Sequence, residues 1–569
     1  VSPNDNRTAA GKLNGKVLEL RLVARIALWR PEGRAGPEVP IFAFAEDVAG
    51  SRPQIPGPLI RVPVGTEVRV SIRNSLPAEL RIFGLQDRPG DRVDSLELAP
   101  GERREARFRV GAPGTYLYWA RTTTDTVAIG QLEDGQLSGA IVVDSLGAGR
   151  VPNERVFVMG LWKARETPPG TPVERREETL VFNGRAWPTT ERLSYNVGDS
   201  VRWRVINATR RAHPMHLHGF YYRIDARGTP LRDTVYSREQ QRLAVTERLA
   251  QGTSMSMTWA PHTPGNWLFH CHLVEHIAGR MDLAAHQQPA SSHKNHALQG
   301  MSGLVLGITV RPRPGAPLVR RETVARRTLR LFATERPRMY GDASAYSFVL
   351  QEGASEPAPD SMRVPGTPIV LTRGEPVAIT VLNRMRVPVT VHWHGIELES
   401  YFDGVGDWSG NSSRVAPSIA SGDSFVVRLT PDRAGSFIYH THQDETRQLG
   451  AGLFGPLLVL EPGQVRDTVT DRILLMGTAG PFSDSPASLN GLTTAPPMEL
   501  RAGTSYRLRF INISANENKA VRLLADTAVL RWRALGKDGA ALPAHQAVMR
   551  PARLLMGAGE TWDVELSPP

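Results

Sequence analysis

The strongest constraint on the fold of this chain is a pattern that occurs four times along it. In each copy a glycine precedes a short run of alternating apolar and polar residues, and an asparagine stands nine residues after the glycine. Alternation with a period of two indicates a half-buried strand, and repeats at this spacing are typical of β-sandwiches. We therefore predict an all-β chain of four related Greek-key sandwich domains in tandem, with copies at Gly65 to Asn74, Gly198 to Asn207, Gly374 to Asn383 and Gly503 to Asn512.

Domain limits follow from where the pattern stops. The 52 glycines and 44 prolines recur between short strand-like runs, as expected for a chain rich in turns. Copies one and three resemble each other most, as do copies two and four, so the chain reads as a duplicated two-domain unit. The fourth copy ends soon after its strand at 561–566, and we expect it to be incomplete. The predicted domains are residues 1–147, 148–312, 313–463 and 464–569.

Charge and hydropathy argue against two classes of partner. The 68 basic residues exceed the 57 acidic ones, for a net charge of +11, but the arginines are scattered and form no basic cluster. We interpret them as a solvated surface and expect no nucleic-acid partner. No apolar run approaches the roughly 18 residues of a spanning helix, so we expect no membrane partner. The start at Val1, without an initiator methionine, fits a periplasmic or secreted protein whose export signal has been removed.

Histidine placement is the clearest chemical signal. Chance placement of 15 histidines predicts roughly 0.4 His-x-His pairs, whereas the chain has four. Residues i and i+2 of a strand project from the same face, so both imidazoles of a pair can reach one metal cluster. The sequence therefore predicts a metal site built from His216 and His218, His270 and His272, His392 and His394, and His440 and His442.

The single cysteine stands inside one of these pairs. In a strand, Cys271 projects to one face while His270 and His272 project to the other, so one strand would touch two metal centres. His213, His276 and a methionine can complete the centre at Cys271. A thiolate with two imidazoles and a distant thioether is the ligand set of blue copper electron-transfer sites.

Four motifs resemble the copper motifs of the multicopper oxidases, the laccase family, which is built from cupredoxin domains. They are His213-Pro-Met-His-Leu-His-Gly219, His270-Cys-His-Leu-Val-Glu-His276, His392-Trp-His-Gly395 and Tyr439-His-Thr-His442. The resemblance implies four coppers per active site: a type 1, a type 2 and a binuclear type 3 centre. It implies His213, Cys271 and His276 as type 1 ligands, His216 and His392 as the type 2 pair, and as type 3 ligands His218, His270, His272, His394, His440 and His442.

The order of the motifs departs from that of laccases, because the cysteine domain here precedes the His-Trp-His-Gly domain. Aligning the repeats places Phe83, Leu85, Trp119 and Arg121 of domain one where domain three has its paired histidines. In domain four the histidine positions are taken by residues such as Asn518, Val521 and Leu523. We therefore expect the trinuclear site between domains two and three. A monomer suffices for this arrangement, and a domain-swapped homo-oligomer is the alternative.

Three further assignments complete the predicted site. Asp403, in Tyr401-Phe-Asp-Gly404, resembles the family's acidic residue beside the cluster and is the expected proton donor, whereas Glu275 should face away. Met301 is favoured over Met281 as the axial ligand, because it resembles the start of the last cupredoxin strand. The insertion at 282–300 carries histidines that we interpret as solvated loop residues, namely His286, His293 and His296. The alternative is that they cover the substrate entrance or bind an extra copper.

The resemblance implies a laccase-like enzyme that couples one-electron oxidation of phenolic or similar small molecules to four-electron reduction of O2 to water. One alternative is a metallo-oxidase of Cu(I) or Fe(II), although the 13 methionines are dispersed. A copper nitrite reductase needs only one type 2 copper, and the paired histidines argue against it. A copper electron carrier or storage protein is an alternative of a different class, which would need no trinuclear site.

Overall fold

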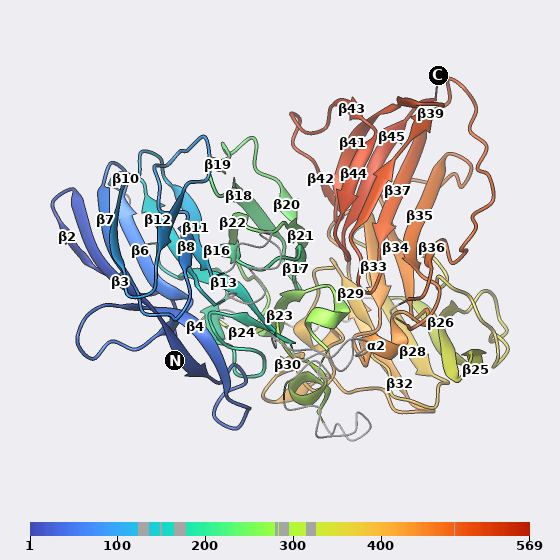
Figure 1. The fold of residues 1–569 in the computed structure, drawn as a ribbon. Helices are drawn as coiled ribbons and strands as arrows, with labels where there is room; N and C mark the ends of the chain where they lie inside the picture. Colours follow the sequence, from blue (N-terminus) through green and yellow to red (C-terminus); the bar gives the residue numbers. More distant parts are fainter. Residues whose placement is uncertain are drawn as a thin grey trace.

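The computed structural model describes residues 1–122, 136–147, 149, 151–163, 178–278, 283, 295–313, 326–482 and 484–568. Nearly every element in these ranges is a strand, which confirms the predicted all-β class. Figure 1 shows the strands in successive groups, from domain one in blue to domain four in red. Within these described ranges, the helical turns are η2 (Val274–His276), the π-helical turn η5 (His296–Gly300), η6 (Ser400–Phe402) and α2 (Glu445–Gln448).

Domain one consists of two sheets that enclose a hydrophobic core. The first has the order β1 (Ser2–Pro3), β5 (Gln54–Ile55), β4 (Val39–Glu46), β3 (Val17–Trp29), β7 (Glu67–Asn74) and β10 (Arg103–Arg109), with β2 (Lys12–Asn14) on β3. The second has the order β6 (Gly57–Pro63), β12 (Ser138–Asp144), β11 (Gly114–Arg121), β8 (Leu80–Phe83) and β9 (Ser95–Leu98).

Domain two repeats this plan around the largest aromatic core of the chain. One sheet has the order β14 (Glu178–Phe182), β13 (Glu154–Lys163), β16 (Val201–Asn207), β22 (Ser254–Trp259), β18 (Tyr222–Gly228) and β19 (Asp233–Val235), with β20 (Leu243–Ala244) on β18. The other has the order β15 (Arg192–Asn196), β24 (Val305–Arg311), β23 (Gly265–Cys271), β17 (His213–Leu217) and β21 (Thr246–Leu249). Two short strands of domain three extend it, β30 (Gly410–Asn411) on β23 and β31 (Arg414–Val415) on β30.

Domains three and four follow with smaller sheets. Domain three pairs β26 (Ala343–Leu350), β25 (Arg327–Tyr340), β28 (Val377–Asn383) and β32 (Ser424–Leu429) with β27 (Ile369–Thr372), β34 (Phe454–Leu460), β33 (Gly435–His440) and β29 (His392–His394). Domain four has β36 (Ala487–Leu489), β35 (Asp471–Thr478), β37 (Tyr506–Asn512), β45 (Thr561–Leu566), β41 (Arg531–Lys537) and β42 (Ala540–Ala541), with β43 (Met549–Pro551) on β41. Two further pairs are β38 (Lys519–Arg522) with β44 (Arg553–Met556) and β39 (Leu524–Ala525) with β40 (Ala528–Val529).

The repeated asparagine has the same structural role in all four domains. Asn207 is fully buried at the end of β16. Its Nδ2 donates to the carbonyls of Arg211 and Leu249 at 2.7 and 3.1 Å, and its Oδ1 accepts from the Thr209 amide at 2.9 Å. Equivalent side-chain bonds start from Asn74, Asn383 and Asn512. Because each asparagine satisfies backbone groups where a strand ends, the spacing of the repeat reflects one conserved turn geometry.

Domain one keeps the fold of domain three with aromatic residues in place of histidines. Phe83 of β8 is paired with Trp119 of β11, just as His392 of β29 is paired with His440 of β33. The Phe83 and Trp119 rings stack with centroids 5.4 Å apart. The predicted correspondence is thus confirmed, and domain one has apolar stacking where domain three places metal-ligating groups.

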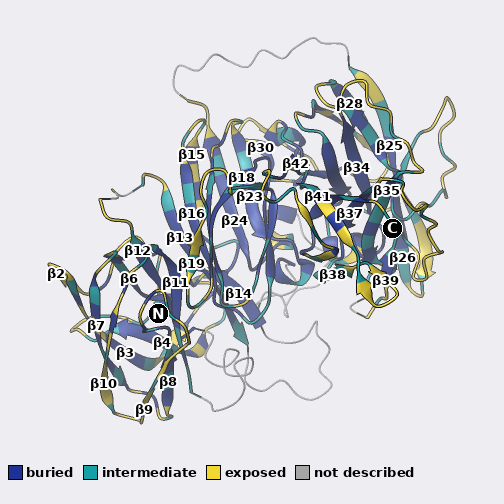
Figure 2. Ribbon diagram, turned by 90° about the horizontal axis from the view of Figure 1, so that it is seen from above, coloured by how far each residue is buried: buried dark blue, intermediate teal, exposed yellow. Residues whose placement is uncertain are grey.

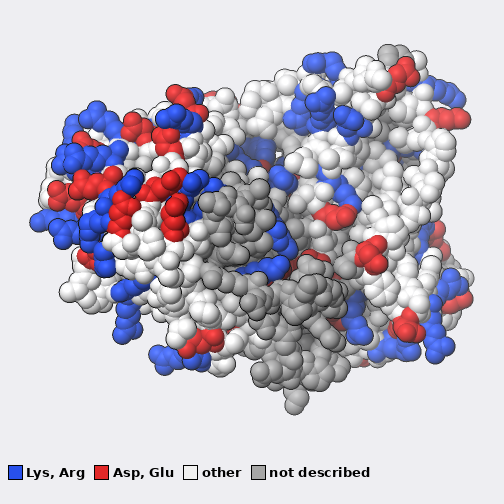
Figure 3. All heavy atoms as spheres, viewed as in Figure 1, with Lys and Arg blue, Asp and Glu red and all other residues white. Residues whose placement is uncertain are grey.

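Domains two, three and four meet in a shared apolar cluster that includes Val274, Ile438 and Ile511. Figure 2 shows buried residues in dark blue along the strands of every domain. On the outside, basic and acidic side chains alternate over domain one in Figure 3. One group of such ion pairs in this domain joins Arg73 and Arg103 to Asp47. No helix in the described ranges has the length and apolar character needed to cross a membrane. The domain limits drawn from the sequence stay a prediction.

Candidate metal centre

The four histidine pairs converge at the contact between domains two and three. Domain two contributes the pairs at the ends of β17 and β23, and domain three contributes those of β29 and of the end of β33. Strand β29 contains both of its histidines, whereas His218, His272 and His442 stand just after their strands. All eight side chains are buried. Their ligand atoms form three clusters, and each cluster draws on both domains: His216, His218 and His392; His218, His270 and His442; and His272, His394 and His440. One chain therefore brings together every paired histidine that the sequence singled out.

Ring nitrogens inside the clusters face one another at short distances. His218 Nε2 lies 2.9 Å from His270 Nε2, and His216 Nε2 lies 3.2 Å from His392 Nε2. The rings of His216 and His394 are stacked with centroids 3.8 Å apart. These contacts direct the lone pairs of several imidazoles at common points.

On several of these imidazole rings, Nδ1 forms a hydrogen bond with an oxygen atom that can accept a hydrogen bond but cannot donate one. A carbonyl or carboxylate oxygen fixes the proton on Nδ1, and Nε2 is then left as the ligating atom. The anchored Nδ1 atoms donate as follows: His216 to Val245 O at 3.0 Å, His218 to Asp403 Oδ2 at 2.9 Å, His270 to Cys271 O at 2.8 Å, His392 to Asp403 O at 2.8 Å and His440 to Thr441 O at 2.7 Å.

The donor set fits a group of cations. Burial, reinforced by the neighbouring imidazoles, lowers the pKa well below its usual value for His216, His270, His272, His394, His440 and His442. Within the described residues no hydrogen bond reaches either ring nitrogen of His272 or His442, Nε2 of His440 or Nδ1 of His394. Buried polar atoms without partners are costly, and cations placed between the neutral rings would satisfy them.

A fourth cluster lies around the single cysteine, on the other face of β23 as predicted. Cys271 Sγ is 3.2 Å from His276 Nδ1 and 3.5 Å from His213 Nδ1, and the two imidazole nitrogens are 2.9 Å apart. Burial raises the pKa of the Cys271 thiol, while burial and then Arg211 lower the pKa of His213 to about 3. A soft cation would stabilise the thiolate and accept both neutral imidazoles, so these donors fit copper.

The axial ligand of this cluster stays a prediction. Met301 is buried in the same hydrophobic core as Cys271, and it forms an isolated bridge with Ala278 two residues after His276. Met281 lies outside the described residues. Of the two candidates, only Met301 thus lies within the described residues, and the reduction potential of a Met301→Leu variant would test its role.

The interpretation of His296 as a solvated loop histidine is wrong. His296 is buried at the start of η5, and its ring centroid lies 6.2 Å from that of His442. A Cβ on Gly300 would be 2.5 Å from His296 Nδ1, so the turn folds tightly over the ring. Tertiary contact has therefore drawn part of the insertion against the histidine clusters. His286 and His293 lie outside the described residues.

Two carboxylates contact the histidines from domain three. Asp403 is fully buried; burial by itself would raise its pKa, but His218 and His392 hold it below its ordinary value. Glu445, which the sequence analysis missed, has Oε1 3.7 Å from His442 Nδ1, and burial with nearby Asp444 raises its pKa to about 8. Its position three residues after a His-x-His pair, on one helical turn, was the available signal.

Glu275 faces away from the clusters, as predicted. Its backbone amide donates to Asn516 Oδ1 at 2.9 Å, and its carboxylate accepts from Asn516 Nδ2 at 3.2 Å. Both contacts lead to domain four. Glu275 therefore belongs to the domain contact and not to the group of acids beside the histidines.

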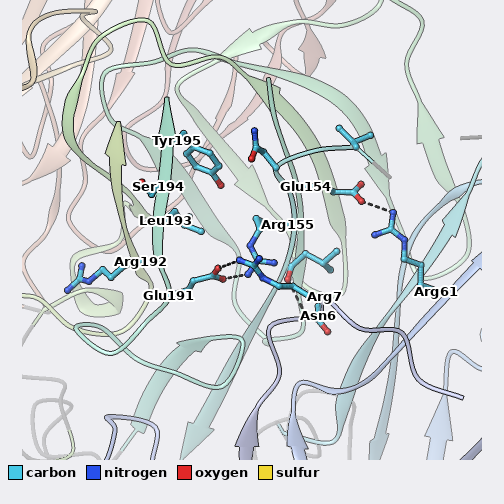
Figure 4. Close-up of a pocket in the computed structure, with 13 residues that line it drawn as sticks. Asn6, Arg7, Arg61, Glu154, Arg155, Glu191, Arg192, Leu193, Ser194 and Tyr195 are labelled. Atoms are coloured by element: carbon cyan, nitrogen blue, oxygen red, sulfur yellow. Dashed lines mark hydrogen bonds and ion pairs between the residues drawn. The ribbon is translucent and has the colours of Figure 1, made fainter. Parts of the chain in front are cut away.

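A cavity of about 360 Å³ lies apart from the histidines, between domains one and two. Figure 4 shows its charged lining, in which Arg61 pairs with Glu154 at 2.6 Å and Arg7 pairs with Glu191 at 2.8 Å. Arg155 also pairs with Glu191. These three arginines are thus paired with carboxylates, whereas the guanidinium of Arg192, which also lines the cavity, lies 3.8 Å from the centroid of the Trp187 ring.

Comparison with known proteins agrees with the geometry. A family model described as multicopper oxidase matches residues 43–146 and again 361–464, and a second model of the same description matches residues 165–291. The double match bears out the likeness of copies one and three.

Individual relatives are more distant. The "Probable nitrite reductase-hydroxylamine oxidoreductase fusion protein" of Kuenenia stuttgartiensis is 27% identical over 263 residues, which are 43% of this chain and 29% of that protein. Laccase-5 of Trametes versicolor is 30% identical over 186 residues, 27% of this chain and 34% of that protein. The chain thus spans about a third of the length of these two relatives. A blue copper oxidase structure from Nitrosomonas europaea has a TM-score of 0.39 at 18% identity and covers 51% of this chain and 85% of that chain.

One family model covers the segment of domain three that carries its paired histidines, and the other covers most of domain two with its paired histidines. Proteins of this family are copper-dependent oxidoreductases with type 1, type 2 and type 3 coppers, and the four clusters supply imidazole and thiolate ligands of that kind. The chain belongs to the multicopper oxidase family.

Proposed function

We propose that the protein is a laccase-like oxidase, which couples one-electron oxidation of phenolic or similar small reductants to four-electron reduction of O2 to water. The observation that carries the proposal is that Cys271, the last residue of β23, stands between His270 and His272, so that single peptide links join the cysteine cluster to the histidine clusters. Bound coppers would accept electrons one at a time at the cysteine and deliver four of them to O2 at the histidines.

The residue roles in this proposal follow the clusters. His213, Cys271 and His276 would bind the type 1 copper, with Met301 as the axial ligand. His216 and His392 would bind the type 2 copper, since their Nε2 atoms face each other. Two sets of three would bind the type 3 pair: His218, His270 and His442, and His272, His394 and His440.

A small surface notch beside His276 supports the proposal that a reductant donates electrons there. The notch has room for about one water molecule and is lined by Glu178, Thr179, Leu180, Glu275, His276, Ser302 and Gly303. A planar phenol could lie against this edge and pass an electron to the His276 ring. The narrow notch does not itself select one reductant, so Fe(II) and Cu(I) oxidation is the second candidate function.

Oxygen uptake with several reductants tests the proposal. Copper-loaded protein should contain four coppers per chain and consume O2 with a phenol, forming water without released peroxide. Fe(II) and Cu(I) should be compared at equal concentration. A faster rate with either metal ion would favour the metallo-oxidase, and one copper per chain without O2 uptake would support an electron carrier.

An exported location stays a prediction from the sequence.

The proton route supplies a second prediction. Asp403 and Glu445 are the acids in contact with the clustered histidines within the described part of the chain. Asp403→Asn and Glu445→Gln keep the shape of each side chain but remove a carboxylate that can carry protons, so each should lower kcat about 100-fold. The KM for the reductant and the blue absorption should stay unchanged, because neither residue contacts the Cys271 cluster. Unchanged kcat in both variants would contradict the proposed route.

A further inference from the structure

We infer that domain four, which has no paired histidine, positions two ligand histidines of the trinuclear site through Asp538 and Thr246. This inference rests on the proposed copper site and adds to it a role for a domain without ligands. Neither Asp538 nor Thr246 is a metal ligand in the proposal; both act through the imidazoles that they hold.

The first observation is the buried tip of a hairpin. β41 and β42 pair Lys537 with Ala540 around the two-residue turn Asp538-Gly539, whose φ angles of 50° and 75° are those of a type I′ turn. Hairpin tips normally lie in solvent, but Asp538 is 1% exposed. A Cβ on Gly539 would be 2.2 Å from the Phe437 ring of β33. The tip is therefore wedged against the strand that carries His440.

The same tip holds a strand of domain two. Asp538 Oδ2 accepts hydrogen bonds from the amides of Val245 and Thr246, both at 3.1 Å, and its Oδ1 accepts from the Thr561 amide at 3.0 Å. Lys537 Nζ donates to the Thr246 carbonyl and lies 2.8 Å from Asp538 Oδ2. Domain four thus forms hydrogen bonds with both the backbone amide and the backbone carbonyl of Thr246.

The side chain of Thr246, held in this position, contacts two histidines of the clusters. Its Oγ1 lies 3.1 Å from His216 Nδ1 and 2.9 Å from His394 Nε2, in the gap between domains two and three. A hydroxyl oxygen has two lone pairs and can accept from both N–H groups. His216 Nδ1 shares its proton between this hydroxyl and the Val245 carbonyl, so both acceptors keep His216 Nε2 on the metal side. His394 Nε2 donates to the hydroxyl, which leaves His394 Nδ1 for ligation.

Lys537 has other acidic partners besides Asp538, so it stays paired when the Asp538 carboxylate is removed. Lys537 Nζ also lies 3.7 Å from the carboxylates of Glu247 and of Glu560, and Glu247 makes a bidentate pair with Arg242. An Asp538→Asn variant would therefore keep partners for Lys537 while it loses the charged acceptor for two amides. Breaking the outer hydrogen bonds of ligating histidines typically weakens metal binding 10- to 100-fold.

The first test changes only the hydroxyl. In the copper-loaded full chain, Thr246→Val should weaken retention of copper against a chelator about 10- to 100-fold and alter the electron paramagnetic resonance signal of the type 2 copper. Thr246→Ser keeps the hydroxyl and should restore both readouts. The blue absorption of the Cys271 centre serves as an internal control and should not change. A Thr246→Val protein with native copper content and an unaltered type 2 signal would overturn the inference.

The second test addresses domain four and uses a matched control. Asp538→Asn should lower the copper content from four towards one per chain. The control, Asp563→Asn, changes another buried carboxylate of domain four, which pairs with Arg509 and accepts a hydrogen bond from Ser436 Oγ of β33 but contacts neither Val245 nor Thr246. The control should lower the melting temperature but keep four coppers. Equal copper loss in both variants would show that domain four acts only through stability. If the unaltered protein binds fewer than four coppers, the proposed function fails before either variant is considered.

Discussion

The Cys271→Ser variant is expected to fold, to lack the intense blue absorption and to lose oxidase activity below detection. The side chain is fully buried and its Sγ faces His213 and His276 at 3.5 and 3.2 Å. Serine has nearly the same shape, but its oxygen supplies neither the thiolate–copper bond that gives the colour nor the electron path along β23. We expect the free energy of unfolding to fall by about 1 kcal/mol, as for a typical buried substitution.

Copper content separates this result from a general loss of structure. The histidine clusters lie on the opposite face of β23 and do not include the Cys271 side chain. The variant should therefore keep about three coppers per chain and a near-native circular dichroism spectrum. A Cys271→Ser protein that stays blue would place the type 1 copper elsewhere, and loss of all copper would show that the two sites do not bind independently.

Repetition is what made most of the fold predictable. Each copy contains a turn glycine, an alternating strand and a buried asparagine, and the structure shows the same side-chain bonds at Asn207 and its three counterparts. The histidine pairs were equally clear because two imidazoles on one strand face must reach the same place. These signals are local, so the sequence shows them directly.

Groups that act across domains were not predictable in this way. Thr246 is one threonine among many, and its role depends on Asp538, which is 292 residues away in the chain. His296 stands in a polar insertion whose composition indicated a solvated loop, yet η5 packs it beside His442. A single polar residue shows its role only when the fold brings its partners to it. Thr246, Asp538 and His296 were therefore missed because their roles depend on contacts between domains or with an insertion, whereas Glu445 was missed although its partner His442 is only three residues away.

A mixture of two inactive variants should stay inactive, because one chain supplies both halves of the trinuclear site. His270→Ala removes a ligand from the cluster of His218 and His442, and His394→Ala removes one from the cluster of His272 and His440. Each variant alone should lose O2 uptake. When the two are unfolded together and refolded, every chain still pairs its own domains two and three, and no intact site can form.

Domain exchange would give a different and measurable result. In a swapped dimer each site combines domain two of one chain with domain three of the other, so random pairing would leave about a quarter of the sites with all ligands. The O2 uptake of unaltered protein that has been unfolded and refolded in the same way provides the reference activity. Pairing of β30 in domain three with Asn266 of β23 in domain two favours the inactive outcome, because the two domains share a sheet within one chain. Recovery near a quarter of the reference activity would show instead that the oxidase assembles its copper site between chains.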